Sequence, residues 1–113
     1  MKNRILLFIF FSYFFLFNLS YSEIVKFESP ELKILDSGNK VIANKGVRVE
    51  SDDGIIINAD EGTYNKKDNI LNVIGNVLIK DNIDDILINA DEGVYNKKDN
   101  TINAIGNILI KDN

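Results

Sequence analysis

Two stretches of this 113-residue chain have nearly the same sequence, and their repetition decides the fold. Residues 58–82 read NADEGTYNKKDNILNVIGNVLIKDN, and residues 89–113 read NADEGVYNKKDNTINAIGNILIKDN. The two stretches match at 20 of 25 positions when Asn58 is aligned with Asn89. A weaker third copy, residues 29–52, precedes them at nearly the same spacing. Self-similarity at a fixed spacing indicates a repeat architecture in which each unit packs against its neighbours.

Each unit has the composition and the alternation of β-strands. Isoleucine and valine dominate, Pro30 is the only proline, and no stretch shows an apolar period of 3.6 residues. Alternate residues of a strand point to the same face, so one phase of each unit is expected to face the interior. That phase is apolar in all three units apart from one lysine, and its members are Val41, Ala43, Lys45, Val47 and Val49; Leu71, Val73, Gly75, Val77 and Ile79; and Ile102, Ala104, Gly106, Ile108 and Ile110.

In the second and third units, the strand that precedes this apolar phase itself changes phase part-way along its length. Ile57 and Ala59 share one face, but Tyr64 falls in the opposite phase. A β-bulge around residues 60–62 would return the tyrosine to the apolar side, and Gly62 is the residue expected to host it. The third unit repeats the pattern at the equivalent positions, with Gly93 and Tyr95.

Short polar segments separate the strands. Residues 65–69 and 96–100 both read NKKDN, and residues 51–54 and 81–85 are rich in aspartate. Asparagine and aspartate tolerate left-handed backbone angles and bond to their own backbone, so these segments predict turns. The sequence therefore predicts an all-β fold of about six antiparallel strands, built from stacked hairpin repeats of about 30 residues.

The N-terminus has the three-part layout of a secretory signal peptide. Lys2 and Arg4 precede an apolar run over residues 5–17, and Ser20 and Ser22 place small residues before a cut at Glu23. An uncleaved membrane anchor is the alternative, but the run is short for a span of about 20 residues. We expect residues 1–22 to be a signal peptide and residues 23–113 to be one exported domain.

Composition argues against several classes of function. The net charge is −4, and a nucleic-acid binder acting through its overall field would need the opposite sign. The chain has no His and no Cys, which removes the commonest general base, the commonest thiol nucleophile and the soft metal ligands. We expect no enzymatic activity, no cofactor, no metal site and no nucleic-acid partner.

The acidic and basic pairs do not suggest a site. Asp60 and Glu61 are adjacent in a strand, so their carboxylates are expected to point to opposite faces and not to share a proton. The aspartate pairs at residues 52–53 and 84–85 lack both the EF-hand spacing and the glycine-rich nonapeptide pattern of calcium sites. The lysine pairs at residues 66–67 and 97–98 are each followed by an aspartate, and solvated turns are the expected interpretation for all of these pairs.

The repeated motif resembles a known family. Ala59-Asp60-Glu61, then Tyr64, then Gly75-Asn76-Val77 is similar to the OstA-like domain of lipopolysaccharide transport, the domain of LptA and of the N-terminal region of LptD. The third unit carries the same pattern, and the resemblance covers residues 24–113. The first unit departs from it, with Lys45-Gly46-Val47 in place of Gly-Asn-Val.

The resemblance implies an open, twisted antiparallel β-jellyroll whose apolar interior holds the acyl chains of lipopolysaccharide. It also implies a location in the periplasm, at or near the outer membrane. There the domain would pair by its edge strands with other jellyroll domains of a transport bridge and would contact the outer-membrane assembly machinery. The implied lining residues are Ile57, Ala59, Leu71, Val73, Val77, Ile79, Ile88, Ala90, Ile102, Ala104, Ile108 and Ile110.

Alternatives remain open from sequence. The same apolar residues would fill the core of a structural or adhesive β-repeat protein, and a calcium-stabilised repeat is a third interpretation. Within the family, the chain fits an LptA-like protein or the front part of an LptD, because no barrel-like sequence is present.

Overall fold

Residues 24–112 form an all-β structure, as predicted. The computed structural model describes residues 24–112, and the expected signal peptide lies outside the described residues. Besides one short 3-10 turn, η1 (Asp36–Gly38), the regular elements are β1 (Ile24–Glu28), β2 (Lys33–Leu35), β3 (Lys40–Ala43), β4 (Val47–Ser51), β5 (Ile55–Ala59), β6 (Glu61–Asn65), β7 (Ile70–Asp81), β8 (Ile86–Asn96), β9 (Thr101–Ile105) and β10 (Leu109–Asp112). No helix within these residues is long and apolar enough to cross a membrane.

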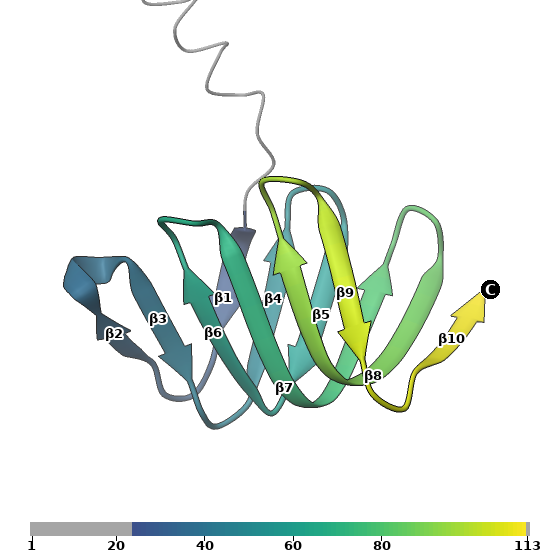
Figure 1. Ribbon diagram of the computed structural model, residues 1–113, viewed down its shortest axis with the longest axis horizontal. Helices are drawn as coiled ribbons and strands as arrows, with labels where there is room; N and C mark the ends of the chain where they lie inside the picture. Colours follow the sequence, from purple (N-terminus) through teal and green to yellow (C-terminus); the bar gives the residue numbers. More distant parts are fainter. Residues whose placement is uncertain (1–23, 113) are drawn as a thin grey trace, which may run out of the picture.

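The strands form a curled antiparallel sheet, a half-barrel of the jellyroll-like kind (Figure 1). Consecutive short strands are the two halves of one bent pass: β1 with β2, β3 with β4, β5 with β6, and β9 with β10. The long strands β7 and β8 make the bend without a break. Six passes therefore stack along the molecule, which matches the number of strands that the sequence predicts.

Because every pass bends, the sheet has two arms. The first arm pairs β1, β4, β5, the C-terminal half of β7, the N-terminal half of β8, and β10. The second arm pairs β2, β3, β6, the N-terminal half of β7, the C-terminal half of β8, and β9. The bends lie along one edge of the molecule, and the β4–β5 and β8–β9 turns lie at the opposite edge (Figure 1).

The expected change of phase occurs at the bend, but the extra residue lies on another strand. Ala59 and Gly62 are both buried, which requires a phase change between them. The register of β7 against β8 shifts between Ile74 and Val77, where two residues of β7 face one residue of its neighbour. The prediction that Gly62 hosts the bulge is therefore wrong. Gly75 hosts it with φ +87°, a left-handed angle that glycine adopts without a steric cost.

The core lies between the arms and joins them. Cross-strand pairing aligns Val49, Ile57, Ile79 and Ile88 in one row across the first arm. In the second arm Leu71 pairs with a tyrosine on each side, in β6 and in β8. Buried residues from both arms form one apolar cluster, so the period-2 pattern of the sequence produces a single core.

The turns follow the predicted chemistry. Asn69 and Asn100 occupy the same position of the two NKKDN segments and have φ of +57° and +55°. Asp85 has φ +56° in the β7–β8 turn. These left-handed angles confirm that the polar segments are turns built on asparagine and aspartate.

Candidate functional site

Most of the residues expected to line an apolar interior lie in the packed core. Leu71 has no exposed surface, and the side chains around it come from both arms. The buried members of the expected lining are Ile57, Ala59, Leu71, Val73, Val77, Ile79 and Ala90. In the middle of the molecule the interior is therefore filled by the protein's own side chains.

The remaining members of the lining become more exposed toward the C-terminal end of the stack. Ile88, Ile102 and Ala104 are partly buried and pack against the core. Ile108 and Ile110 are 50% and 61% exposed, although both were expected on the interior face. Ile110 pairs with Ile88, so its phase is the expected one. It is exposed because no strand of the described chain lies beyond β9 and β10.

Two contacts join the arms on the side away from the bends. The first is aromatic: Phe27 of β1 stacks on Tyr64 of β6, with ring centroids 6.4 Å apart and planes inclined by 22°. Such a stacked pair stabilises an interface beyond the apolar area that it buries. It closes the N-terminal part of the half-barrel.

The second contact is polar, and we call its residues Asp53, Tyr95 and Lys97 the clasp. The Tyr95 hydroxyl donates to Asp53 Oδ2 at 2.9 Å, across the two arms. Lys97 Nζ lies 2.9 Å from the Tyr95 oxygen and 3.3 Å from Asp53 Oδ2. Ser51 Oγ also donates to Asp53. The β4–β5 turn of the first arm is therefore bonded to the β8–β9 turn of the second.

The clasp contains a fully buried lysine side chain. Lys97 has no exposed side-chain surface, and its ammonium group also lies 4.6 Å from the centre of the Tyr95 ring. A buried ammonium is tolerated only when it is paired and hydrogen-bonded. The expectation of a solvated turn is thus wrong for Lys97, whereas Lys66, at the same position of the preceding repeat, is exposed as expected.

The clasp shifts the pKa values of two of its members. Burial tends to raise the pKa of the Asp53 carboxyl, but hydrogen bonds from Ser51 and Tyr95 and the charge of Lys97 outweigh it and hold the pKa below its ordinary value of 3.8. Burial raises the pKa of the Tyr95 hydroxyl above its ordinary value of 10.0. At neutral pH the clasp therefore holds the Asp53 side chain as a carboxylate and the Tyr95 side chain as a neutral phenol.

The conspicuous Ala-Asp-Glu and Gly-Asn motifs build the bend. The Asp60 amide donates to the Gly75 carbonyl at 2.9 Å, and Asn76 Nδ2 donates to Asp60 Oδ2 at 2.8 Å. A Cβ atom on Gly75 would lie 2.7 Å from Asp60 Oδ2, so any other residue there would have to displace the Asp60 side chain. The third unit repeats these contacts among its equivalent residues, which are Asp91, Gly106 and Asn107. The motif was identified from the sequence as a family resemblance, but its structural role at the bend was not predicted.

The paired carboxylates of the repeated motif lie at the bend. Asp60 and Glu61 are both exposed at the bend, and the Asp60 carboxylate accepts the hydrogen bond from Asn76. Among residues 24–112, no three acidic groups converge in a way that could hold a metal ion. The polar motifs thus form hydrogen-bonded bends, and the surface left for binding is apolar.

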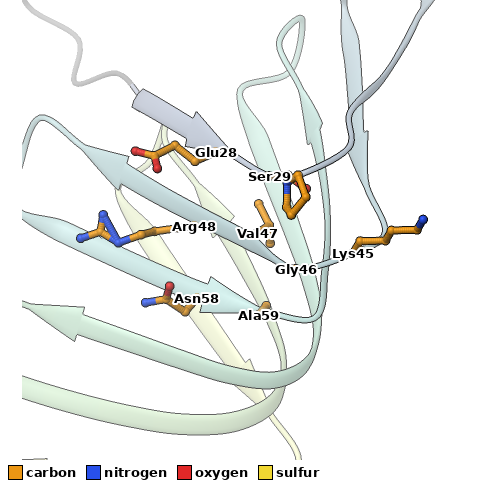
Figure 2. Close-up of a pocket in the computed structure, with 9 residues that line it drawn as sticks. Glu28, Ser29, Lys45, Gly46, Val47, Arg48, Asn58 and Ala59 are labelled. Atoms are coloured by element: carbon orange, nitrogen blue, oxygen red, sulfur yellow. The ribbon is translucent and has the colours of Figure 1, made fainter.

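A shallow hollow of about 530 Å³ lies where β1 leaves β4 (Figure 2). Ala59 is the only member of the expected lining that reaches it, and the hollow is otherwise bordered by Glu28, Lys45 and Arg48 among others. Its cations are paired, because Lys45 lies 3.0 Å from a glutamate and Arg48 lies 3.0 Å from another. The apolar surface at the C-terminal end is thus the better candidate for a ligand.

Comparison with known proteins adds no identification. A scan against protein-family models finds no match, and a search of the curated proteins finds none. The features that bear on function are therefore the apolar surface at the C-terminal end and the edge strands β9 and β10.

Proposed function

We propose that the chain is a periplasmic module that binds lipopolysaccharide and hands it toward the outer membrane, as an LptA-like protein or as the N-terminal part of an LptD. The module carries out no reaction and needs no cofactor. Binding relies on apolar contact with acyl chains, which the aliphatic interior face is suited to make.

One observation carries the proposal: the interior phase of the sheet emerges from the core at the C-terminal end. Ile102 and Ala104 are partly buried, and Ile110 is mostly exposed on the same face. An acyl chain lying along these residues would extend the apolar core and remove their surface from water, at about 25 cal/mol per Å². The ligand would thus bury this end of the interior face, just as the protein's own strands bury the middle of that face.

The same end supports pairing with another jellyroll domain. β9 and β10 each pair only with β8 in the described chain, so their outer edges carry unpaired backbone groups. Open edges are templates for strand addition. We propose that a neighbouring domain of a transport bridge or of the outer-membrane assembly machinery pairs here. Sedimentation of the purified chain over a range of concentrations tests self-pairing, and a single monomeric species throughout would argue against pairing between copies.

Two adjacent residues of β10 provide a matched test of lipid binding. Ile110 lies on the interior phase and Lys111 on the opposite phase, and both are exposed. A photo-crosslinking residue at position 110 should capture lipopolysaccharide in cells, and one at position 111 should not. Equal capture at both positions, or none at either, would contradict the proposal.

A structural or adhesive β-repeat protein is the second candidate, and the filled middle of the molecule favours it. Leu71 and Ala43 have no exposed surface, and the interior around them has no room for an acyl chain. This candidate predicts that no lipid accompanies the protein when it is purified from membranes in mild detergent. Mass spectrometry of the purified protein separates the two functions.

A further inference from the structure

We infer that the clasp is a latch. It holds together the tips of the two arms, which are the β4–β5 turn and the β8–β9 turn, and its release opens the apolar interior along its side. This inference concerns the motion of the protein and does not rest on which ligand the interior binds. It rests on the position of the clasp, which lies between a part of the sheet whose interior residues are buried and a part whose interior residues are exposed.

The clasp joins parts of the molecule that the sheet itself does not join. Asp53 lies 42 residues before Tyr95 in the chain and belongs to the other arm. Strand pairing runs along each arm, and the arms are continuous with each other only at the bends. The tips meet through the side chains of Asp53, Tyr95 and Lys97, together with a longer ionic contact of 3.9 Å from Lys97 Nζ to Asp52.

Contacts of this kind separate more easily than the core does. The side chains of Asp53 and Asp52 are 31% and 44% exposed, so water can solvate the carboxylates when the turns part. The Tyr95 and Lys97 side chains would then gain access to water as well. The stacked pair of Phe27 and Tyr64 lies farther toward the N-terminal end and would stay in place as the limit of the opening.

The interior face differs between the level of the clasp and the level of the next repeat. Asp84 occupies the position in the next repeat that corresponds to Asp53, and it is exposed in the β7–β8 turn. At this level Ile110, on the interior phase, is exposed as well. The interior phase is buried at the level of the clasp, and it is exposed at the level of Asp84, where no strand of the described chain lies beyond β9 and β10. Breaking the clasp should extend the exposed region by one repeat toward the N-terminus.

The distance between the two tips tests the latch directly. The chain has no cysteine, so spin labels can be placed at the partly exposed residue Glu50 and at the exposed residue Lys98 of the full chain, neither of which belongs to the clasp. We expect Lys97→Met, which keeps the length of the side chain and removes its charge, to shift the label distances to longer values. Lys66→Met in the same labelled chain is the matched control, because Lys66 occupies the same NKKDN position but is exposed. Its distances should not change.

A second variant and a second reporter keep the inference testable if Lys97→Met folds poorly. Asp53→Asn preserves a hydrogen-bond acceptor for Tyr95 and removes only the charge, and it should shift the distances in the same direction by less. A single cysteine at the buried position Ile55, the first residue after the β4–β5 turn, should react faster with a maleimide in either clasp variant than in the Lys66→Met control. Far-UV circular dichroism establishes that the sheet is intact.

Unchanged distances and unchanged thiol reactivity in folded clasp variants would overturn the latch. An equal increase in the Lys66→Met control would overturn it too, because the effect would then follow from lysine loss in general. A clasp variant with longer tip distances, a faster thiol reaction and an intact sheet would establish it. Loss or retention of lipid binding is a separate measurement and does not enter this decision.

Discussion

The second and third repeats have almost the same sequence and very different surroundings. Val77 is 1% exposed and its counterpart Ile108 is 50% exposed, although the two occupy matching positions of their repeats. Ile79 and Ile110 differ in the same way, at 2% and 61%. The lysines differ in the opposite sense, because Lys66 is exposed and Lys97 is buried.

The difference shows that environment follows from place in the stack. In the described chain the second repeat has passes on both sides, whereas no strand lies beyond the last pass of the third repeat. Lys97 is buried because the β4–β5 turn lies opposite the β8–β9 turn, and this contact spans 44 residues. Local sequence specifies the strand and its phase, but burial requires a neighbour that the local sequence does not encode.

The largest expected effect comes from emptying the middle of the core. Leu71→Ala removes a side chain with no exposed surface, and such truncations cost about 2–5 kcal/mol. Ile102→Ala, at the matching position of the third repeat, should cost less because Ile102 is partly exposed and its site can fill with water. Urea unfolding monitored by circular dichroism measures both. Equal losses would mean that the third repeat is covered in solution.

The bend gives the next largest effect. Gly75→Ala places a methyl group at φ +87° and 2.7 Å from the Asp60 carboxylate, and we expect a loss of about 1–3 kcal/mol. Gly46→Ala is the control, because Gly46 has the same φ and no atom within 4 Å of the added group. The excess loss at Gly75 measures the steric part. If the two variants unfold at the same urea concentration, the carboxylate contact is not important for the bend.

The strands, their phase and the turns could be predicted from this sequence because they depend on local pattern. The alternation of apolar residues predicted that Leu71, Val73, Val77 and Ile79 share a face, and all four are buried. The repeat also predicted about six antiparallel strands in stacked hairpins, because each unit of about 30 residues contributes the same strands.

Three features could not be predicted, for physical reasons. The host of the bulge depends on which of two paired strands carries the extra residue, and both Gly62 and Gly75 are chemically suited to it. The burial of Lys97 follows from a contact between distant turns, while the local sequence around it is identical to that around Lys66. The exposure of Ile110 follows from the position of an edge, which an alternating pattern does not mark.

An intermediate effect is expected when the clasp is titrated with acid. The pKa of Asp53 is below 3.8 in the folded chain, so its charged form contributes stability above that value, and the contribution disappears as the pH falls through the folded pKa. Asp53→Asn should therefore cost about 1 kcal/mol at neutral pH and nothing at pH values where Asp53 is protonated. Unfolding free energies of both proteins between neutral and acidic pH measure the difference, and a constant gap would show that the charge of Asp53 is not involved.

The smallest effect is expected at the open edge. Ile110→Thr keeps a β-branched side chain in β10 and changes a residue that is 61% exposed, so the free energy of unfolding should change by no more than about 0.5 kcal/mol. Urea unfolding should be measured at low and at high protein concentration. A loss above that limit that grows with concentration would mean that another copy covers Ile110 and buries it as Ile79 is buried in the second repeat. The difference in burial between the two repeats would then exist in the single chain and disappear when copies of the chain assemble.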